Sequence, residues 1–376
     1  MRQIDRYILN LTFLLRDHLW NFINFMNLRA LLEHIECGFC QCRLSQQSVP
    51  TMRRSAITSK SAWPRPQGPG CCLRIGTYNI QVDHDRDIST WREWQHRRPL
   101  AVNAVAALDC DLLLIQEPGP SMAVDLNADL GPEFRVQTTP CDPAMWSPGS
   151  EDEPKVGQAF DGNGFIWRTS RLQLLGDIQT VWLSRTPEQP SKGVPTAWDS
   201  SEFCRTMVKA NFKDLQTGRT VRAISAHLDH HGETARVESA KLVMAHAHEA
   251  HTEGATVVVG GDFNTFPEHE AHGPQTYAAL VDAARVGGFV DVRAAAAAHV
   301  DFGVGEDSWK GWPGAKFCRA ENRANYPDPV LGQDSSRFDQ LFVHGSEVVS
   351  FTGVVEESSW APASDHVPIV AEIALV

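Results

Sequence analysis

The sequence of 376 residues lacks the motifs of several common enzyme classes. It has no G-x-x-x-x-G-K-[ST] loop, which excludes NTP hydrolysis of the P-loop kind, and no G-x-S-x-G elbow, which excludes the commonest esterase site. It also has no H-E-x-x-H pair for zinc. Charged residues make up 21% and hydrophobic residues 42%, an ordinary globular mixture that excludes wholesale disorder.

The cysteines are odd in number and mostly scattered along the chain. The nine cysteines do not form the dense, even pattern of a disulfide scaffold, so a reducing, cytoplasmic compartment is the simpler interpretation. Secretion or organelle targeting remains open. Near His34, a cluster could bind zinc, but it lacks a second ligand pair at finger spacing, so we favour unpaired thiols. The cluster consists of Cys37, Cys40 and Cys42.

Acidic residues are absent from residues 37–82, which sets the N-terminal part of the chain apart. Residues 1–36 show apolar residues at helical spacing and predict an amphipathic helix. Its longest uncharged stretches, Tyr7–Leu15 and His18–Leu28, are too short to span a bilayer, so no transmembrane segment is predicted. Residues 52–72 are rich in Ser, Pro, Gly and basic residues, which is typical of a flexible linker or, alternatively, of a targeting leader. We therefore expect a leader over residues 1–72, dispensable for activity, and a folded domain over residues 73–376.

Negative charge is concentrated in the predicted domain. Residues 1–72 hold 9 Lys and Arg against 4 Asp and Glu, whereas residues 73–376 hold 25 against 42, so the net charges are +5 and −17. A domain this acidic repels polyanions, which disfavours unaided binding of long duplex DNA. A substrate that carries phosphate would need a metal ion or a local basic pocket.

Apolar runs that predict strands alternate with helical patterns after residue 72. Helices are predicted at residues 90–108, 233–250 and 275–286, and the alanine run 294–298 predicts a short helix or a loop. Strands dominate, which predicts a layered α/β or α+β domain. The predicted strands are residues 73–79, 111–117, 164–168, 172–183, 204–212, 220–227, 256–262, 338–343 and 367–373.

Polar clusters stand at the ends of these apolar runs, where strands would bring them to one rim of a sheet. Any one cluster alone is more often a turn or a helix cap than a catalytic group. Together they hold carboxylates and an amide, the oxygen ligands that suit Mg²⁺. The clusters are Asn79, Gln116 with Glu117, His227 with Asp229, Asp262 with Asn264, Arg337 with Asp339, and Ser364 with Asp365 and His366.

The motifs TYNI, LLLIQE, SAHLDHHG, GGDFNTFPE, RFDQLFVHG and SDHVPIVAEI, in this order, resemble the endonuclease/exonuclease/phosphatase superfamily, also called DNase I-like. The resemblance runs from about Leu73 to the C-terminus, so residues 73–376 would form the catalytic domain. It implies an α/β (α+β) fold: a four-layer sandwich of two mainly antiparallel β-sheets flanked by helices. The active site would lie at the rim of the sandwich.

The resemblance also implies a metal site. Glu117 would be the main ligand of Mg²⁺, with Mn²⁺ as the alternative ion. Asn79 and Asp365 would assist it.

The same resemblance assigns catalytic roles. His366, paired with Asp339, would activate or orient the attacking water, because a carboxylate on one ring nitrogen raises the basicity of the other. Asp262 would align the nucleophile or assist proton transfer. Asn264 and His227 would hold the phosphate oxygens and steady the transition state.

A finer resemblance concerns the substrate. The segment WLSRTPEQPSKGVPTAWDSSEFCRTMVKANF resembles a bacterial and fungal branch of the superfamily. In it Arg205 would be either a bidentate phosphate contact or a surface ion-pair residue. Trp198 and Lys192 would wall the substrate pocket, whereas a core role is favoured for Trp182.

One departure bears on function. Gln81 stands where abasic-site endonucleases carry an aspartate ligand, which points away from DNA repair. We expect a Mg²⁺-dependent hydrolase of phosphate esters, first of all a phosphodiesterase or nuclease that reads single-stranded RNA from its 3′ end. A small-molecule or lipid phosphoesterase and a catalytically inactive binding module are the alternatives. No obligate protein partner is inferred.

Overall fold

The computed structural model describes residues 72–83, 90, 92–142, 162–193, 196–200, 203–252, 255–265, 274–300, 337–352 and 363–375. The helix, linker and cysteine cluster predicted in the leader lie outside these residues, apart from Cys72. In the described part of the chain, no helix is long and apolar enough to cross a membrane.

The described strands form two sheets. The seven-stranded sheet has the order β10 (Ala298–Val300), β12 (Ser346–Thr352), β13 (Ile369–Leu375), β1 (Cys72–Asn79), β2 (Leu112–Gln116), β4 (Gly162–Arg168) and β3 (Phe134–Pro140). The six-stranded sheet has the order β5 (Leu172–Trp182), β6 (Thr206–Asp214), β7 (Thr220–His227), β8 (Thr256–Asp262), β11 (Asp339–His344) and β9 (Val290–Asp291). The pairs β1–β2, β10–β12 and β7–β8 are parallel, and the other neighbours are antiparallel.

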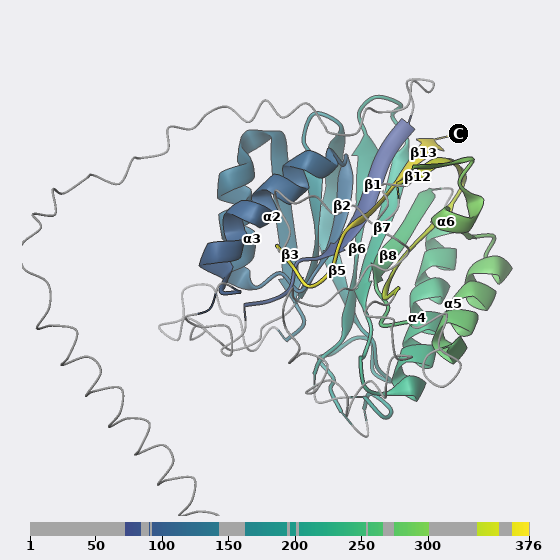
Figure 1. Cartoon of the computed structure of the whole chain (residues 1–376). Helices are drawn as coiled ribbons and strands as arrows, with labels where there is room; N and C mark the ends of the chain where they lie inside the picture. The colour runs from purple at the N-terminus through teal and green to yellow at the C-terminus, as the bar shows by residue number, and fades with distance from the viewer. Residues whose placement is uncertain are drawn as a thin grey trace, which may run out of the picture. The chain divides into compact units, whose positions relative to one another are not determined.

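Helices cover the outer faces of both sheets (Figure 1). The helices α2 (Trp94–Leu108) and α3 (Pro120–Leu130) pack on the seven-stranded sheet, where Tyr78 and Ile115 join their apolar cluster. The helices α4 (Glu233–Thr252) and α5 (Pro274–Val286) pack on the six-stranded sheet around Phe263 and Phe342. A third cluster fills the space between the sheets, so the predicted four-layer sandwich is confirmed.

Several described elements were not apparent in the sequence. Only Met122 and Leu126 are fully buried in α3, and β3 is an edge strand with a partly exposed face, so neither segment shows a strong apolar pattern. The alanine run is divided between two elements, because the short helix α6 (Val292–Ala295) ends inside it and β10 begins at Ala298. The short strand β9 was also missed, as was β12, which lies next to the edge strand β10.

Strand register brings the polar strand ends together. Asn79 lies opposite Gln116 in the parallel pair β1–β2, whereas Asp262 lies opposite both His227 in β7 and Asp339 in β11. Side chains alternate between the two faces of a strand, and the residues four positions before Asn79, His227 and Asp262 belong to the core between the sheets: Ile75, Ala223 and Val258. The polar side chains at this end therefore face one another across the rim of the sandwich.

Gly261 allows the close approach of β7 and β8 at this rim. Its backbone has a φ of 152°, and a Cβ atom there would lie 1.9 Å from the carbonyl oxygen of Ala226. A side chain at this position would push apart the strands that carry His227 and Asp262.

Candidate active site

The centre of the site is an amide shared between two carboxylates. The Nδ2 atom of Asn79 donates to Oε1 of Glu117 at 2.9 Å and to Oδ2 of Asp262 at 3.0 Å. Asn79 and Asp262 are buried at the ends of β1 and β8, and Glu117 directly follows β2. Three strands from two sheets thus contribute one polar group each to a single point.

Backbone strain accompanies this convergence. Gln81, Glu117 and Asn264 all have left-handed backbones, with φ of 51°, 61° and 47°. This conformation is tolerated by asparagine but is uncommon for glutamine and glutamate, and such strain tends to cluster at functional sites. Hydrogen bonds hold it in place: Val82 N donates to Glu117 Oε2 at 3.0 Å, and Asn264 N donates to Asp262 Oδ1 at 2.9 Å.

His227 completes a group that fits a divalent ion. Its Nε2 atom lies 3.5 Å from Asp262 Oδ2 and 4.0 Å from Glu117 Oε1, and one donor atom from each of the three side chains lies within 4.8 Å of the others. Carboxylate oxygens suit Mg²⁺, and a mixed oxygen and imidazole set also suits Mn²⁺. The donor chemistry fits the ion that the sequence suggested, with His227 in the group beside Glu117.

Asp339 and His366 form the expected pair. Nδ1 of His366 lies 2.8 Å from Oδ2 of Asp339, and its Nε2 lies 3.5 Å from Oδ2 of Asp262. Burial disfavours the charged imidazole, but the negative charges of Asp339 and Asp262 and the hydrogen bond to Asp339 outweigh it, and they raise the pKa of His366 to about 10. The ring is thus held between two carboxylates and oriented by one of them.

Asp262 lies at the junction of all these groups. Burial raises the pKa of its carboxyl to about 7, although the nearby His366 acts in the opposite direction. A carboxyl that titrates near neutrality and touches His366, His227 and Asn79 is suited to exchange a proton during a reaction.

Arg205 lies on the other side of His227. The residue is only 8% exposed, so it is not the surface ion-pair residue that the sequence left open. Its Nη1 lies 3.0 Å from Nδ1 of His227, and its Nη2 lies 2.8 Å from Nδ1 of His230. Burial, and then the charge of Arg205, lower the pKa of His227 well below its usual value and that of His230 to about 3. Both rings are neutral at pH 7.

The structure describes three other predicted residues without testing their roles. Asn264 is buried, and its Nδ2 donates to the carbonyl oxygen of Leu228 at 3.0 Å. Asp365 is half-buried and is not part of the three-residue group, so its role as a ligand stays a prediction. Trp198 is half-buried with a φ of 56°, and its contact with substrate also stays a prediction.

Three further residues come from the segment that the sequence analysis linked to the substrate pocket. Trp182 is half-buried and lies outside the apolar clusters of the described residues, so the core role favoured for it stays a prediction; its Nε1 donates to the carbonyl oxygen of Cys141 at 2.8 Å. Lys192 is exposed. Asp199 accepts from Thr234 N and Ala235 N, so it caps the start of α4.

Arg97 is a residue that the sequence interpretation missed. It is fully buried in α2, and its side chain donates to the carbonyl oxygens of Ile80 at 2.9 Å, Gln81 at 2.9 Å and Ala363 at 3.0 Å. It therefore ties the loop after Asn79 to the loop before His366. The sequence did hold a signal that Arg97 is buried: position 97 falls on the helix face that also buries Trp94, Ala101 and Leu108.

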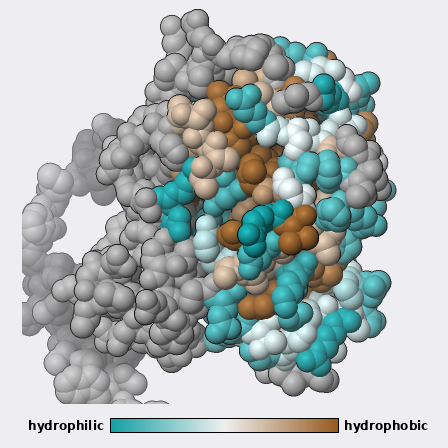
Figure 2. Space-filling view, turned by 90° about the vertical axis from the view of Figure 1, so that its right-hand side faces the viewer, coloured by the Kyte–Doolittle hydropathy of each residue, from teal (hydrophilic) through white to brown (hydrophobic). Residues whose placement is uncertain are grey.

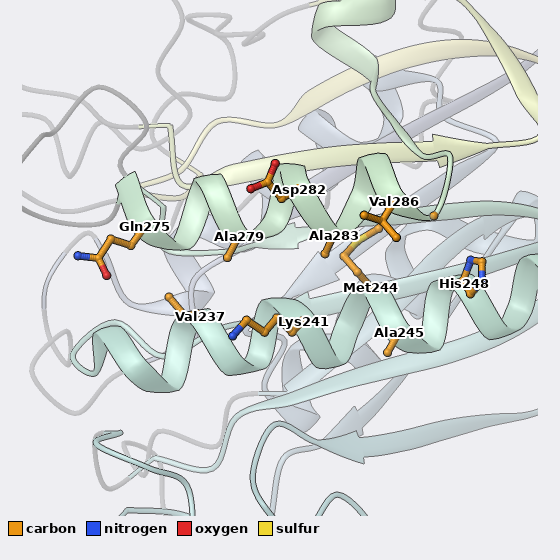
Figure 3. A pocket seen from close by; sticks show the side chains of 11 residues that line it. Val237, Lys241, Met244, Ala245, His248, Gln275, Ala279, Asp282, Ala283 and Val286 are labelled. Atoms are coloured by element: carbon orange, nitrogen blue, oxygen red, sulfur yellow. The ribbon is translucent and has the colours of Figure 1, made fainter.

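A separate cavity of about 720 Å³ lies between α4 and α5, on the outer face of the six-stranded sheet (Figure 3). Figure 2 shows that face of the molecule, where hydrophobic side chains alternate with hydrophilic ones. Val237, Met244 and Ala283 line the cavity together with Lys241 and Asp282. None of the strand-end residues described above is among its lining residues, so this cavity is not part of the candidate active site.

A sandwich of two mixed sheets with an acidic and histidine-containing centre at its rim defines a class of metal-assisted hydrolytic proteins. The sequence profile of the Endonuclease/Exonuclease/phosphatase family matches residues 76–366, and the chain belongs to this family. Its members are phosphoesterases, and they generally depend on a divalent metal. A search of curated proteins found no match.

Solved structures share this fold. A mannosyl-6-phosphatase of Bacteroides thetaiotaomicron is 23% identical, with 80% of this chain and 99% of that chain covered and a TM-score of 0.61. An endonuclease/exonuclease/phosphatase of Bacteroides vulgatus is 25% identical, with 81% and 99% covered and a TM-score of 0.61. TDP2 of D. rerio, complexed with a single-strand DNA product, is 17% identical, with 80% and 98% covered and a TM-score of 0.51.

Proposed function

We propose that this protein is a divalent-metal-dependent hydrolase that cleaves the phosphate monoester of a small polar molecule. The observation that carries the proposal is the convergence of Glu117, His227 and Asp262 with the His366–Asp339 pair and the buried Arg205. This set supplies a metal site, a group that can move a proton, and a cation for phosphate.

The metal would be held by Glu117 and His227, with the amide of Asn79 and the carboxylate of Asp262 next to it. When bound there, Mg²⁺ or Mn²⁺ would neutralise charge on the phosphate oxygens. Asp365, which is half-buried and precedes His366 in the chain, would be a further ligand, as the sequence suggested.

The remaining groups would position the reactants. Asp262 would orient a water molecule and accept its proton as the water oxygen bonds to phosphorus, while His366, oriented by Asp339, stabilises the charge on Asp262. The bond from phosphorus to the ester oxygen breaks, the departing oxygen takes a proton from bulk water, and Asp262 gives up its proton to bulk water, so that one water molecule is consumed. Arg205 and the side chain of Asn264 would hold the other phosphate oxygens, and Trp198 would border the substrate.

Charge favours a small monoester over a polymer. A terminal phosphate carries about −1.5 to −2 charges, which match a buried guanidinium next to a metal site. The net charge of −17 on residues 73–376 opposes a long polyanion but affects a small ester far less. The fold is compatible with this chemistry, because a mannosyl-6-phosphatase is built on it.

A second candidate is the 3′ end of single-stranded RNA, the substrate favoured by the sequence. The observation in its favour is Phe203, an aromatic side chain that is 46% exposed beside Arg205. Nucleic-acid bases stack on such rings.

A panel of esters tests both candidates. Wild-type protein is assayed with Mg²⁺, with Mn²⁺ and with EDTA on hexose 6-phosphates, nucleoside monophosphates, glycerol 3-phosphate, bis-p-nitrophenyl phosphate and oligo(A). We expect phosphate release from monoesters that EDTA abolishes and that His366→Ala reduces strongly, with the exposed Asp177→Asn as the control variant. Preference for oligo(A) would establish the second candidate instead. Turnover without metal, or none on the whole panel, would refute metal-dependent hydrolysis.

A further inference from the structure

Three aromatic side chains lie next to one another outside Arg205. The ring centroids of Phe203 and His230 are 5.7 Å apart, and those of His230 and His231 are 4.1 Å apart. Phe203 and His231 at the two ends of the group are exposed, whereas His230 between them is half-buried. We name these three residues the aromatic shelf.

The exposure of Phe203 is unusual in its setting. Six large hydrophobic side chains of the described residues are exposed, and Phe203 is the aromatic one among them. A single exposed apolar side chain needs no explanation by itself. Here, however, the ring lies next to a buried cation, with Cζ of Arg205 5.7 Å from its centroid.

The shelf is connected to the reactive centre by direct contacts. Arg205 touches Phe203 and His230 on one side and His227 on the other, and Nε2 of His227 lies 3.5 Å from Asp262. If Arg205 holds the phosphate of an ester, the alcohol part of that ester would therefore lie next to the aromatic shelf. Because burial and the charge of Arg205 keep His230 neutral, its face is apolar at pH 7.

We propose that the aromatic shelf binds the apolar face of a ring in the alcohol part of the substrate, so that Phe203 selects cyclic phosphate esters over acyclic ones. The proposal rests on the phosphoesterase function proposed above and names its substrate class. A sugar ring and a nucleobase both present such a face, and both stack on aromatic side chains.

Steady-state kinetics of the full chain tests the proposal. Wild type, Phe203→Ala and Phe203→Tyr are compared on a hexose 6-phosphate, AMP and the acyclic glycerol 3-phosphate. We expect Phe203→Ala to raise KM for a cyclic ester roughly tenfold with kcat within about twofold, to leave glycerol 3-phosphate unchanged, and Phe203→Tyr to resemble wild type. A larger change in KM for the hexose 6-phosphate would identify the bound ring as a sugar, and a larger change for AMP would identify it as a nucleobase.

Leu215→Ala is the matched control, because Leu215 is 48% exposed and follows the opposite end of β6. Calorimetric titration of the same esters in EDTA measures binding without turnover, so the shelf is tested even if no ester is hydrolysed. Equal changes for cyclic and acyclic esters, no change for any, or no binding of a cyclic ester by wild type would overturn the proposal. Metal-dependent hydrolysis of glycerol 3-phosphate alone would refute the shelf while the proposed function stands.

Discussion

Single residues at the rim act through shared contacts. One amide group of Asn79 holds Glu117 and Asp262 next to each other, although two carboxylates at this distance repel. A bound cation would relieve that repulsion. A change of Glu117 is therefore expected to weaken metal binding, whereas a change of Asp262 is expected to slow proton transfer.

Glu117→Gln should weaken metal binding while it keeps the shape of the side chain. Because the neutral amide is a poorer ligand for Mg²⁺, we expect a defect in kcat/KM that higher metal concentration partly restores. The measurement is activity against metal concentration. Asp262→Ala serves as the comparison, and its loss of about 10²–10⁴-fold should persist at saturating metal. Equal rescue of both variants would contradict this division of roles.

His366→Ala and Asp339→Asn should not be additive. The 2.8 Å contact between the two side chains means that Asp339 acts by orienting the ring, so its effect disappears once the ring is gone. We expect Asp339→Asn to be the milder change and the double variant to match His366→Ala in kcat. A double variant whose loss equals the product of the two single losses would show that the residues act independently.

At the scale of secondary structure elements, helix α2 supports the site through a side chain that never touches it. Arg97 joins the loop after β1 to the loop before His366 through three backbone carbonyls. The planar guanidinium suits this task because its donors point in set directions.

Arg97→Met should lower kcat by roughly tenfold with a smaller change in KM, because misplacing catalytic groups by a fraction of an ångström slows the reaction. Activity is measured well below the unfolding temperature, where all variants are folded. Arg97→Lys should restore part of the rate. The neighbouring Arg98→Met is the control, since Arg98 pairs with Asp125 and Asp129 at the surface. Unchanged kcat in folded Arg97→Met would show that Arg97 serves stability alone.

At the scale of the whole molecule, a second set of buried charges, far from the site, contributes to the stability of the fold. Asp214, at the opposite end of β6 from Arg205, is fully buried and accepts hydrogen bonds from Arg171 Nε and Thr217 Oγ1, each at 2.5 Å. Burial acts to raise the pKa of this carboxyl, but these hydrogen bonds and the charge of Arg171 outweigh it, and the pKa is lowered from 3.8.

Asp214→Asn should therefore lower the free energy of unfolding by about 2 kcal/mol at pH 7. A depressed pKa means that the ionised group stabilises the fold fully above the unfolded value of 3.8, and that this contribution is lost as the pH falls through the lower folded value. Denaturation of both proteins from pH 7 to pH 3 should show their difference narrowing only below about pH 4. The exposed Asp177→Asn is the control, and a gap independent of pH would contradict this explanation.

The positions of most strands along the chain and most site residues could be predicted because both depend on local patterns. Apolar runs such as those of β2 and β8 are buried on both faces, and the polar residues that end them fall at the rim by simple alternation. Asn79, Glu117, Asp262, Asp339 and His366 were named from the chain alone, and the structure places them together. The weakly patterned α3 and β3 escaped notice because their exposed faces dilute the apolar signal.

The tertiary structure alone decided which of these side chains touch. Strand β1 pairs with β13, nearly the whole domain away in sequence, and Arg97 reaches Ala363 across 266 residues. The sequence left Arg205 equally suited to surface or site, and only the packing of β6 against β7 places it against His227 and His230. The physical reason is that local alternation determines which face a residue occupies, whereas its partners depend on strand order and register, which are set by contacts between segments far apart in the chain.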